Sequence, residues 1–448
     1  MEHVAVDAAV LERANQCTFP TGASLSAVLR PGNAEEVLAC LGHAGRTRQV
    51  LQPVSRGCNW GYGSRQPVGG GAVLLDLSRL DRILSLDEDL GLVQVEPGVT
   101  FGALAKRLEG TRFLAPHTGA APAGSIIGNA LERGIGQGFY EDMAGRLVGL
   151  TVALPNGRLL KLGGATPACG PDLHPLFVQS DLGVVLSAVF ALEPAPMYRQ
   201  LTILTLSSRP ALGRMLDAVR PLLQGQARRL HLKVLSPVHV AGLPLDQSAP
   251  VDQTWTAVFS VWADDEVELD GQRNRLVAAL SADLGTLDTL RAESGAETVE
   301  GARLHLAYPR GLVSSDADPD RDGRGVLWIA PHLPLRGEAV VSRLEAVEAE
   351  MRRFSLPPAI SLRIVDGRSV KVIIGLFFDL DDADAVARAL ACRRSLGRSF
   401  ASAGVPLYRA SVLDDDRLAR PADDQDMLAA LKAWADPNGV LAPSRHLR

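Results

Sequence analysis

Two glycine-rich loops hold the residues whose types and spacing are best suited to chemistry on a bound ligand. The first covers residues 55–64 and reads SRGCNWGYGS, and the second covers residues 116–138. Both follow predicted strands within the first 195 residues. Because glycine has no Cβ, such loops allow backbone N–H groups to approach a pyrophosphate closely. The two loops therefore predict a site for a ligand that contains a pyrophosphate.

Taken singly, neither loop is specific. Neither is a Walker sequence, and neither has the GxGxxG spacing of a dinucleotide-binding crossover. Glycine clusters also mark tight turns, so a plain turn is the alternative for each loop alone. The presence of both loops, in one section of the chain, is what favours a ligand site.

Short strands separated by turns surround these loops. We predict strands at residues 26–30, 50–54, 72–77, 83–86, 92–95, 150–154, 158–162 and 184–192. Asn33 and Glu36 have capping-box spacing and predict a helix to about residue 44, and Thr100 predicts a short helix to about residue 108. The Asn156-Gly157 pair predicts a hairpin between two of the strands. Both loops therefore lie in a section made mainly of short strands.

A Pro-Ala-Pro sequence at residues 194–196 indicates a boundary. Beyond it, strands such as 255–262 and 371–378 alternate with helical patterns at residues 337–354 and 382–403. This alternation predicts a separate α/β domain. The tail, residues 404–448, is too short to fold alone and is expected to pack on an earlier domain.

Composition excludes several classes of protein. With 448 residues, 46% apolar and 22% charged, the chain is long enough for two or three soluble globular domains. A net charge of −5 gives no basic field for nucleic acid or anionic lipid. The five cysteines are scattered, which argues against a disulfide framework and a zinc site: Cys17, Cys40, Cys58, Cys169 and Cys392. Without a signal-peptide core or a transmembrane stretch, a cytoplasmic protein is expected.

Six segments form an ordered series along the chain. They are residues 53–63 (PVSRGCNWGYG), 95–100 (VEPGVT), 124–136 (GSIIGNALERGIG), 152–157 (VALPNG), 179–185 (QSDLGVV) and 436–443 (DPNGVLAP). The series resembles the vanillyl-alcohol oxidase / p-cresol methylhydroxylase (PCMH) family of flavoproteins, in particular its members that oxidise 4-substituted phenols. Ordered matches span most of residues 26–193, whereas the middle of the chain matches only in places.

The resemblance implies an α+β fold with three parts. A two-lobed, PCMH-type FAD-binding domain would cover residues 1–195, an α/β cap domain with an antiparallel sheet residues 196–403, and a segment returning to the FAD domain residues 404–448. It also implies FAD as the cofactor. The residues expected to bind it are Ser55, Arg56, Gly57, Cys58, Asn59, Gly61, Tyr62, Gly63, Gly98, Pro116, Gly124, Ser125, Gly128, Asn129, Gly134, Gly136 and Arg445.

The same resemblance implies four catalytic residues. Tyr62, Tyr408 and Arg409 match two tyrosines and an arginine that surround the phenolic oxygen, and Asp142 matches an aspartate near the reacting carbon. Hydride leaves a benzylic carbon readily only when the ring oxygen is a phenolate. Lowering a phenol pKa from near 10 to 7 requires roughly 4 kcal/mol, and hydrogen bonds to a charged acceptor contribute about 1.5–3 kcal/mol each. Two or three donors therefore suffice, and Asp142 could accept a proton or activate water.

Without the resemblance, each of these residues has a plainer interpretation. Tyr62 alone would be a half-buried packing residue. Tyr408 and Arg409 alone could be a strand residue beside a surface arginine, and Asp142 could be a solvated or capping carboxylate. Their joint match favours the functional interpretation.

The resemblance also bears on how FAD is attached. Many relatives link FAD covalently through histidine or tyrosine, but Asn59 and Trp60 occupy the corresponding place in the first loop. In the cap, Val326 occupies the linking position, and valine cannot form the bond; His332 lies nearby in sequence. Cys58 is expected to be a small buried thiol near the cofactor. We predict FAD bound non-covalently.

Several other patterns are not predicted to form sites. Asp318, Asp320 and Asp322 begin like a calcium loop, but the position that requires glutamate is Ile329, so a solvated, flexible loop is expected and no metal. Arg393 with its neighbour Arg394 is expected to be a solvated helix face.

Four functions remain open. The first is an FAD-dependent oxidase that removes a hydride from the benzylic carbon of a para-substituted phenol through a quinone methide, with O2 as acceptor. The second is a dehydrogenase that passes electrons to another acceptor, and the third is a biosynthetic oxidase of a larger secondary-metabolite substrate. The fourth is a flavin-binding protein without catalysis. The expected partners are a small aromatic substrate, an electron acceptor and a second copy of the chain in a homodimer, with neither nucleic acid nor membrane.

Overall fold

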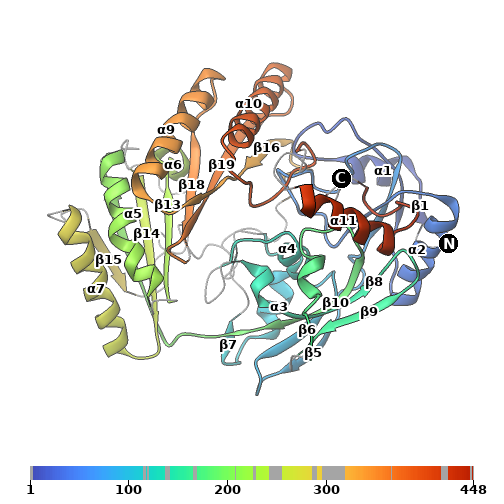
Figure 1. Ribbon diagram of the computed structural model, residues 1–448, viewed down its shortest axis with the longest axis horizontal. Coiled ribbons are helices and arrows are strands. Elements are labelled where there is room, and N and C mark those ends of the chain that lie inside the picture. Colours follow the sequence, from blue (N-terminus) through green and yellow to red (C-terminus); the bar gives the residue numbers. More distant parts are fainter. Residues whose placement is uncertain are drawn as a thin grey trace.

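The computed structural model has two lobes side by side (Figure 1). It describes residues 4–114, 118, 121–136, 142–164, 169–206, 208–225, 229–241, 255–284, 290–294, 318–364, 366–414, 422–443 and 446. We call residues 4–194 with 422–446 the N-terminal lobe, and residues 198–402 the cap lobe. Two residues predicted to bind the cofactor, Pro116 and Arg445, lie outside the described residues.

The first sheet of the N-terminal lobe has four strands. In spatial order they are β1 (Val4–Ala5), β2 (Leu25–Leu29), β4 (Ala72–Asp76) and β3 (Leu51–Val54), and the last three are parallel. Helices α1 (Ala8–Asn15) and α2 (Ala34–Thr47) accompany them. The predicted cap of α2 is present, because the Asn33 side chain accepts a hydrogen bond from the backbone N–H of Glu36.

The second sheet of this lobe has five antiparallel strands. Their spatial order is β5 (Ile83–Asp87), β6 (Leu92–Val95), β10 (Val184–Ala191), β8 (Leu147–Ala153) and β9 (Leu159–Gly163). Helices α3 (Phe101–Arg107) and α4 (Ile126–Leu131) pack their apolar residues on it. Smaller elements are the 3₁₀ turns η1 (Met143–Arg146) and η2 (His174–Phe177) and the paired strands β7 (Phe113–Leu114) and β11 (Glu193–Pro194).

An eight-stranded antiparallel sheet forms the centre of the cap lobe. Its order is β15 (Leu290–Ser294), β12 (Tyr198–Leu206), β14 (Trp255–Ala263), β13 (Leu230–Leu235), β18 (Ala359–Ile364), β19 (Ser369–Asp379) and β16 (Arg324–Ile329), and β17 (His332–Pro334) also pairs with β19. The predicted antiparallel sheet is therefore confirmed, together with the mixed α and β fold class.

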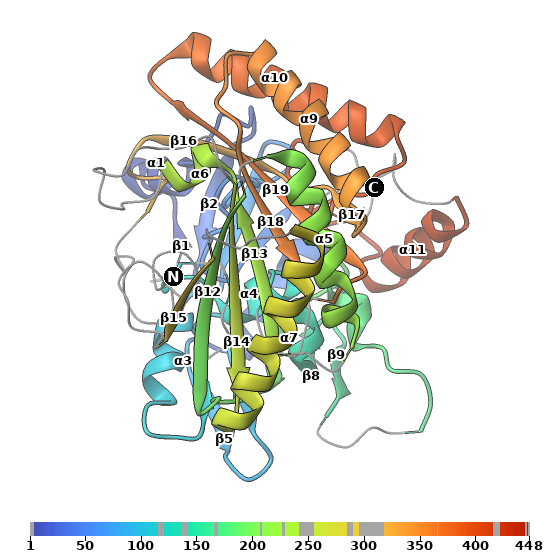
Figure 2. The ribbon, with the colours of Figure 1, turned by 90° about the vertical axis from the view of Figure 1, so that its left-hand side faces the viewer.

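The two faces of this sheet differ. Helices α5 (Arg209–Gln224), α7 (Glu266–Leu284), α9 (Gly337–Arg353) and α10 (Ala383–Ser402) cover one face and bury the main apolar core against it (Figure 2). Successive side chains of a strand point to opposite faces, so the alternate residues point away from these helices. On that second face, Leu201, Ile203, Leu235 and Val258 form a small apolar cluster of their own. The short helix α6 (Pro237–Ala241) follows β13.

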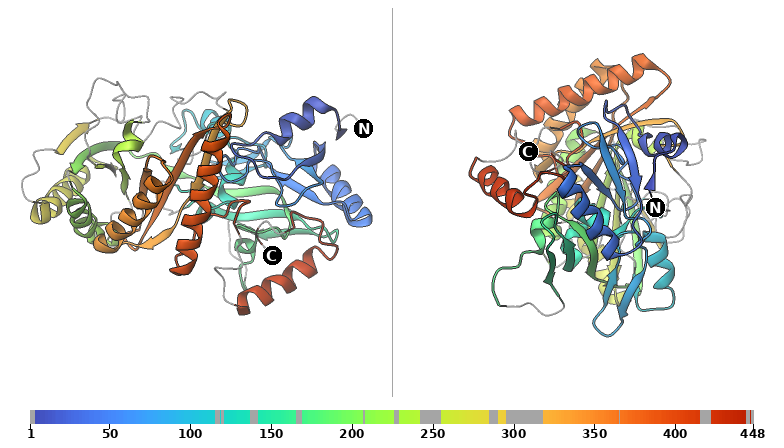
Figure 3. Two further views of the ribbon diagram at one scale, coloured as in Figure 1. Left: turned by 90° about the horizontal axis from the view of Figure 1, so that it is seen from above. Right: turned by 90° about the vertical axis from the view of Figure 1, so that its right-hand side faces the viewer.

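The C-terminal segment contacts the N-terminal lobe (Figure 3). Helix α11 (Ala422–Ala435) packs Ala435 on the core of the five-stranded sheet. Beyond it, the backbone of Leu51 in β3 donates to Val440 and accepts from Ala442. The irregular segment around residues 406–412 lies between the lobes, because Tyr408 N donates to Ala330 of the cap and Val412 N donates to Tyr62 of the first loop.

Two predictions of solvated side chains are wrong. Arg393 is only 2% exposed, and it donates hydrogen bonds to Asp414 and to the backbone carbonyl of Trp328. Asp320 is 4% exposed and accepts hydrogen bonds from Ser64 and Arg65. In both cases the partner comes from a distant part of the chain and replaces water. Within the described residues, no helix combines the length and apolarity needed to cross a bilayer.

Candidate active site

A cleft opens between the two glycine-rich loops of the N-terminal lobe. It encloses about 1220 Å³ of space, counting the part open to solvent. Nine of the residues predicted to bind the cofactor line it: Ser55, Arg56, Gly57, Cys58, Asn59, Gly124, Ser125, Gly128 and Asn129. Both loops therefore face one cavity.

The backbone conformation of the first loop favours glycine at three positions. Gly57, Gly61 and Gly63 have φ values of +68°, +75° and +123°, which residues with a side chain rarely adopt. At Gly61 there is also no room, because a Cβ would lie 2.1 Å from Cδ1 of Trp328 in the cap lobe. Gly61 also accepts a hydrogen bond from Trp328 N at 3.1 Å, so the loop and β16 lie in direct contact.

The second loop is fixed where α4 begins. The Ser125 hydroxyl donates to Pro97 O at 2.6 Å and accepts from Gly128 N at 2.9 Å. A Cβ on Gly128 would lie 3.3 Å from the Ser55 hydroxyl, so a small residue there allows the two loops to approach each other. Five other predicted residues do not line the cleft: Gly61, Tyr62, Gly63, Gly134 and Gly136. Gly98 does not either, and a Cβ there would meet the carbonyl of Ser78 at 2.5 Å, so its role is close packing.

The cleft wall contains buried polar atoms that have no protein partner. Within the described residues, Asn129 Oδ1 and Arg409 Nη2 are buried without a hydrogen bond, and so is Trp60 Nε1 in the first loop. Leaving a buried polar group unpaired costs about 1–3 kcal/mol. A polar cofactor with both donors and acceptors, such as FAD, fits this donor and acceptor set.

Tyr62, Tyr408 and Arg409 come together beside the cleft. The guanidinium carbon of Arg409 lies 5.2 Å from the ring centroid of Tyr62 and 5.8 Å from that of Tyr408. Arg409 Nε donates to the carbonyl of Glu132 at 2.8 Å, and Nη1 lies 3.5 Å from Asn59 Oδ1. The arginine thus touches both loops, both tyrosines and the cleft.

The electrostatics of this cluster favour an anion. Tyr62 is 4% exposed; burial first, then Tyr408, raises its pKa well above the ordinary value, so its hydroxyl keeps its proton. For Arg409, burial lowers the pKa, but Tyr408, Glu132 and Tyr62 outweigh it and the net direction is upward. The cluster therefore presents a protonated phenol and a permanent cation, both of which stabilise a neighbouring oxyanion.

Asp142 is placed differently. Its carboxylate caps η1 by accepting from Gly145 N at 3.2 Å, and its other oxygen lies 3.5 Å from Arg133 Nη1. It is not among the residues that line the cleft, and its neighbours at 137–141 lie outside the described residues. The structure thus shows a capping role for Asp142, and its catalytic role remains a prediction.

The possible attachment points for the flavin have no obvious nucleophile. Burial raises the pKa of the Cys58 thiol to about 11, although Arg65 and Arg56 oppose the shift. Cys58 is therefore a neutral thiol near pH 7, directed at the carbonyls of Arg56 and Ala123. Val326 is buried in β16 and exchanges two hydrogen bonds with Thr18 through its backbone.

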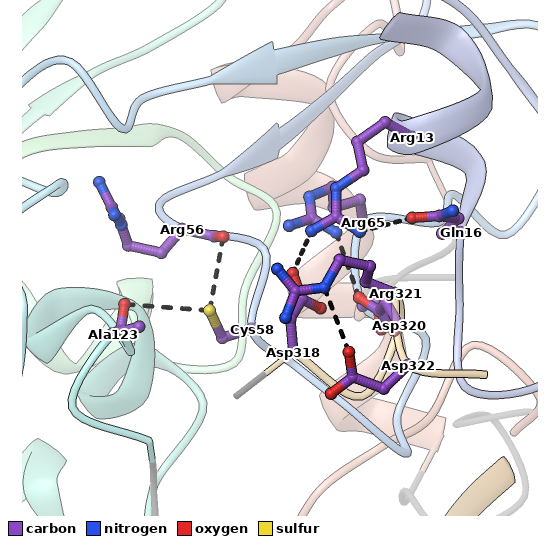
Figure 4. A network of polar contacts seen from close by, with 11 residues as sticks. Arg13, Gln16, Arg56, Cys58, Arg65, Ala123, Asp318, Asp320, Arg321 and Asp322 are labelled. Carbon is purple, nitrogen blue, oxygen red and sulfur yellow. Dashed lines mark hydrogen bonds and ion pairs between the residues drawn. The ribbon is translucent and has the colours of Figure 1, made fainter. Parts of the chain in front are cut away.

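A polar network joins the first loop to the start of the described cap segment (Figure 4). Asp320 accepts from Ser64 at 2.7 Å and from Arg65 at 3.1 Å, and Arg13 of α1 pairs with Asp318. Burial raises the pKa of Asp320 to about 6, and this effect exceeds the opposing effects of Ser64 and Arg65. The loop that lines the cleft is thus tied to the cap lobe through a buried carboxylate.

This carboxylate should make stability depend on pH. Between the unfolded value near 3.8 and the folded value near 6, the native state binds more protons than the unfolded state, so stability falls as pH rises through this window. The decline attributable to Asp320 is on the order of 3 kcal/mol. Urea unfolding of the wild type and of Asp320→Asn is measured between pH 4 and 6.5. The free energy of unfolding of the wild type, relative to that of Asp320→Asn, should fall as the pH rises. The exposed Asp322→Asn variant is the control and should track the wild type.

Sequence reasoning missed part of the cleft wall. Ser180, Asp181 and Gly183 line it, as do Glu132 and His446. The first three lie in the QSDLGVV segment, which carried the resemblance and could have suggested them. Glu132 and His446 approach each other to 3.5 Å from distant parts of the chain, and no local pattern indicates this.

Comparison with known proteins supports a cofactor site in this cleft. Residues 25–163 match the family model described as an FAD binding domain. The chain is 30% identical to 1'-carboxy-chondrochloren decarboxylase of Chondromyces crocatus over 99% of this chain and 94% of that protein. It is 25% identical to the 4-cresol dehydrogenase [hydroxylating] flavoprotein subunit of Pseudomonas putida over 94% of this chain and 87% of that protein. The structure of 4-ethylphenol oxidase from Gulosibacter chungangensis superposes with a TM-score of 0.87 at 23% identity, covering 100% of this chain and 94% of that one.

These similarities extend over nearly the whole length of the chain, and they include the glycine loops, the cap sheet and the C-terminal segment. FAD is thus the cofactor, and the resemblance predicted from the ordered segments is confirmed. The chain belongs to the vanillyl-alcohol oxidase / p-cresol methylhydroxylase family of flavoproteins and is an FAD-dependent oxidoreductase.

Proposed function

We propose that this enzyme removes a hydride from the benzylic carbon of a para-substituted phenol. The observation that carries the proposal is the convergence of buried Tyr62 with half-buried Tyr408 and Arg409 beside the cleft. FAD held in the cleft would accept the hydride. The names of the relatives support a phenolic substrate, since they include a cresol dehydrogenase and an ethylphenol oxidase.

The chain's own residues would act mainly on the phenolic oxygen. Tyr62 and Tyr408 donate hydrogen bonds to it, and Arg409 supplies a fixed positive charge, so the substrate is held as a phenolate. Electron density from the phenolate oxygen then compensates for the departing hydride, and the ring becomes a quinone methide. Asp142 accepts a proton or activates the water that adds to the quinone methide.

A second function draws on the decarboxylase among the relatives. The relative that matches 99% of this chain is a decarboxylase of a carboxylated compound. In a phenol whose carboxylate stands on the carbon next to the benzylic carbon, hydride loss first gives the quinone methide. The bond to the carboxylate then breaks, CO2 leaves, and its electron pair forms a C=C bond while the ring regains its phenolate. The enzyme would then act on a larger, biosynthetic substrate.

Anaerobic mixing with phenols tests the proposal. We expect the flavin absorbance near 450 nm to bleach with 4-hydroxybenzyl alcohol, vanillyl alcohol or 4-ethylphenol, and not with the matched methyl ether 4-ethylanisole, which cannot become a phenolate. Recovery of colour in air, with consumption of O2, identifies an oxidase; recovery only with an added dye or quinone identifies a dehydrogenase. Bleaching by the ether as fast as by the phenol would refute phenolate activation. Size-exclusion chromatography tests the proposed homodimer.

We propose in addition that FAD is bound without a covalent link. Asn59, Trp60 and Val326 offer no suitable nucleophile, and the raised pKa of Cys58 keeps its thiol neutral. Acid precipitation should leave a yellow supernatant and a colourless pellet. A pellet that remains fluorescent, or a tryptic peptide heavier by the mass of the flavin, would contradict this.

A further inference from the structure

Arg393 is a buried cation of the cap lobe that the proposed chemistry leaves without a role. It lies on α10 and is 2% exposed, whereas its neighbour Arg394 is exposed. Charged side chains are almost never fully buried unless they are paired. Arg393 Nη2 donates to the Asp414 carboxylate at 2.6 Å, and Nε donates to the carbonyl of Trp328 at 3.1 Å. The guanidinium therefore joins α10 to β16 and to the segment that follows Arg409.

The bond to Trp328 connects Arg393 with the first glycine-rich loop. Trp328 N donates to Gly61 O at 3.1 Å, while the carbonyl of the same tryptophan accepts from Arg393. The indole also occupies the space beside Gly61, which is why a Cβ on this glycine has no room. Tyr62 follows Gly61 directly in the chain. Arg393 thus fixes the residue against which the backbone next to Tyr62 packs.

The bond to Asp414 reaches Tyr62 by a second route. The carboxylate oxygen that accepts from Arg393 also accepts from Ser411 N at 2.8 Å, and Asp414 N donates to Ser411 O at 3.1 Å. Ser411 is buried, and its hydroxyl donates to Tyr62 O at 3.4 Å. Val412 N donates to the same carbonyl at 3.0 Å. The turn that Arg393 closes therefore contacts the backbone of Tyr62.

Tyr408 and Arg409 lie just before this turn. We call Tyr62, Tyr408 and Arg409 the proposed phenolate site. Tyr408 N donates to Ala330 O at 3.0 Å, directly after β16, so this segment is fixed to the strand that Arg393 binds. Burial, then Tyr408, raises the pKa of Tyr62, whereas Arg409 and then Arg393 lower it. The charge of Arg393 therefore also acts on a hydroxyl of the site.

We propose that Arg393 is a positioning residue for the proposed phenolate site. By joining β16 to the turn at residues 411–414, it holds the first loop against the segment that carries Tyr408 and Arg409. Groups that stabilise a charge must be held within about 0.5 Å of their productive positions, which requires support from the residues behind them. Arg393 does not line the cleft and acts through the residues that it holds. This inference rests on the proposed function, which directs the site at the phenolic oxygen.

Binding of 4-nitrophenol to the FAD-loaded enzyme tests this role. The ligand has no benzylic hydrogen, so it cannot lose a hydride, and its phenolate absorbs at longer wavelength than its neutral form. A titration below the pKa of free 4-nitrophenol gives both the affinity and the ionised fraction of the bound ligand. We expect the wild type to hold it as the phenolate. Arg393→Gln should bind it about tenfold more weakly or worse and ionise less of it, because a misplaced charged donor loses its contribution.

Four further variants separate positioning from general stability. Arg393→Lys keeps the charge but lacks the planar fork that reaches both Trp328 and Asp414, so it should recover only part of the binding. Asp414→Asn should share the defect and add little to that of Arg393→Gln, because both belong to one network; it also tests the network if Arg393→Gln fails to fold. The exposed Arg394→Gln should bind as the wild type does. Leu396→Ala, which removes a buried apolar side chain of α10, should lower the urea midpoint and leave phenolate binding unchanged.

The possible outcomes separate this inference from the proposed function. If Arg393→Gln and Asp414→Asn bind and ionise 4-nitrophenol as the wild type does, the role of Arg393 is overturned and the proposed function stands. An equal loss of affinity in Leu396→Ala would also overturn it, since weakening of the cap lobe would then explain both defects. If the wild type binds 4-nitrophenol only as the neutral phenol, or not at all, the phenolate site is refuted and the role of Arg393 with it.

Discussion

Replacing Arg409 by glutamine should lower kcat/KM for a phenolic substrate by about tenfold to 150-fold, because one charged donor to an anion contributes about 1.5–3 kcal/mol. Arg409 lies within 5.2 Å and 5.8 Å of the two tyrosine rings and supplies the permanent positive charge of the proposed phenolate site. The rate of anaerobic flavin reduction under limiting substrate is the appropriate measurement. FAD content must be matched, since Arg409 also lines the cleft.

The pH profile distinguishes phenolate stabilisation from general damage. As pH rises toward the phenol's own pKa near 10, the substrate ionises without help, so the defect of Arg409→Gln should shrink. Arg409→Lys keeps the charge and should be less impaired than Arg409→Gln. The exposed Arg394 on α10 provides Arg394→Gln as a control with wild-type kinetics. A defect that stays constant across pH would show that Arg409 only supports the local structure.

Replacing Gly61 by alanine should strongly lower the free energy of unfolding. Its φ of +75° is costly for any L-residue with a side chain, by about 1–2 kcal/mol. Its added Cβ would lie 2.1 Å from Cδ1 of Trp328, and overpacking of this kind typically costs about 1–3 kcal/mol more. The urea midpoint should fall accordingly, together with FAD affinity, because the loop must move away from β16.

A matched glycine separates these two causes. Gly110 has a similar φ of +79° but no atom within 4 Å of an added Cβ, so Gly110→Ala carries only the backbone cost. Shortening the facing side chain in Gly61→Ala/Trp328→Ala should recover the steric part relative to Trp328→Ala alone. If Gly61→Ala is no worse than Gly110→Ala, the contact with Trp328 is not tight in solution.

The regular elements could be predicted where their signals are local. The strand pair predicted at residues 83–86 and 92–95 is β5 and β6, and the helices predicted at 337–354 and 382–403 are α9 and α10. Capping by Asn33 and Thr100 depends on neighbours three residues away, so the sequence contains the whole signal. Helices α1 and α11 were not predicted, since their stability depends on contacts with distant strands.

In the candidate site too, the local segments could be predicted from the sequence and the contacts between distant residues could not. Three parts of the site are short continuous segments that can be recognised in the sequence: the first loop, the start of α4 and Tyr408-Arg409. The burial of Asp320 and Arg393 depends on partners far along the chain, so both were expected to be solvated. The alignment of Lys233, Arg363 and Lys371 is less visible still, because it depends on the register of three strands. A shift of one residue in either pairing would send a charge into the opposite core.

The walls of the cleft come from residues as far apart as Gln52 and His446. Ala442 both lines the cleft and donates to Leu51 in β3, so the sheet edge beside the first loop is completed by a segment made nearly four hundred residues later. During synthesis, the strands of the N-terminal lobe can pair as they emerge, but the cavity cannot close around a cofactor until this segment has left the ribosome. Loading with FAD is therefore expected to follow translation, and the waiting apoprotein is the form most exposed to proteolysis in the cell.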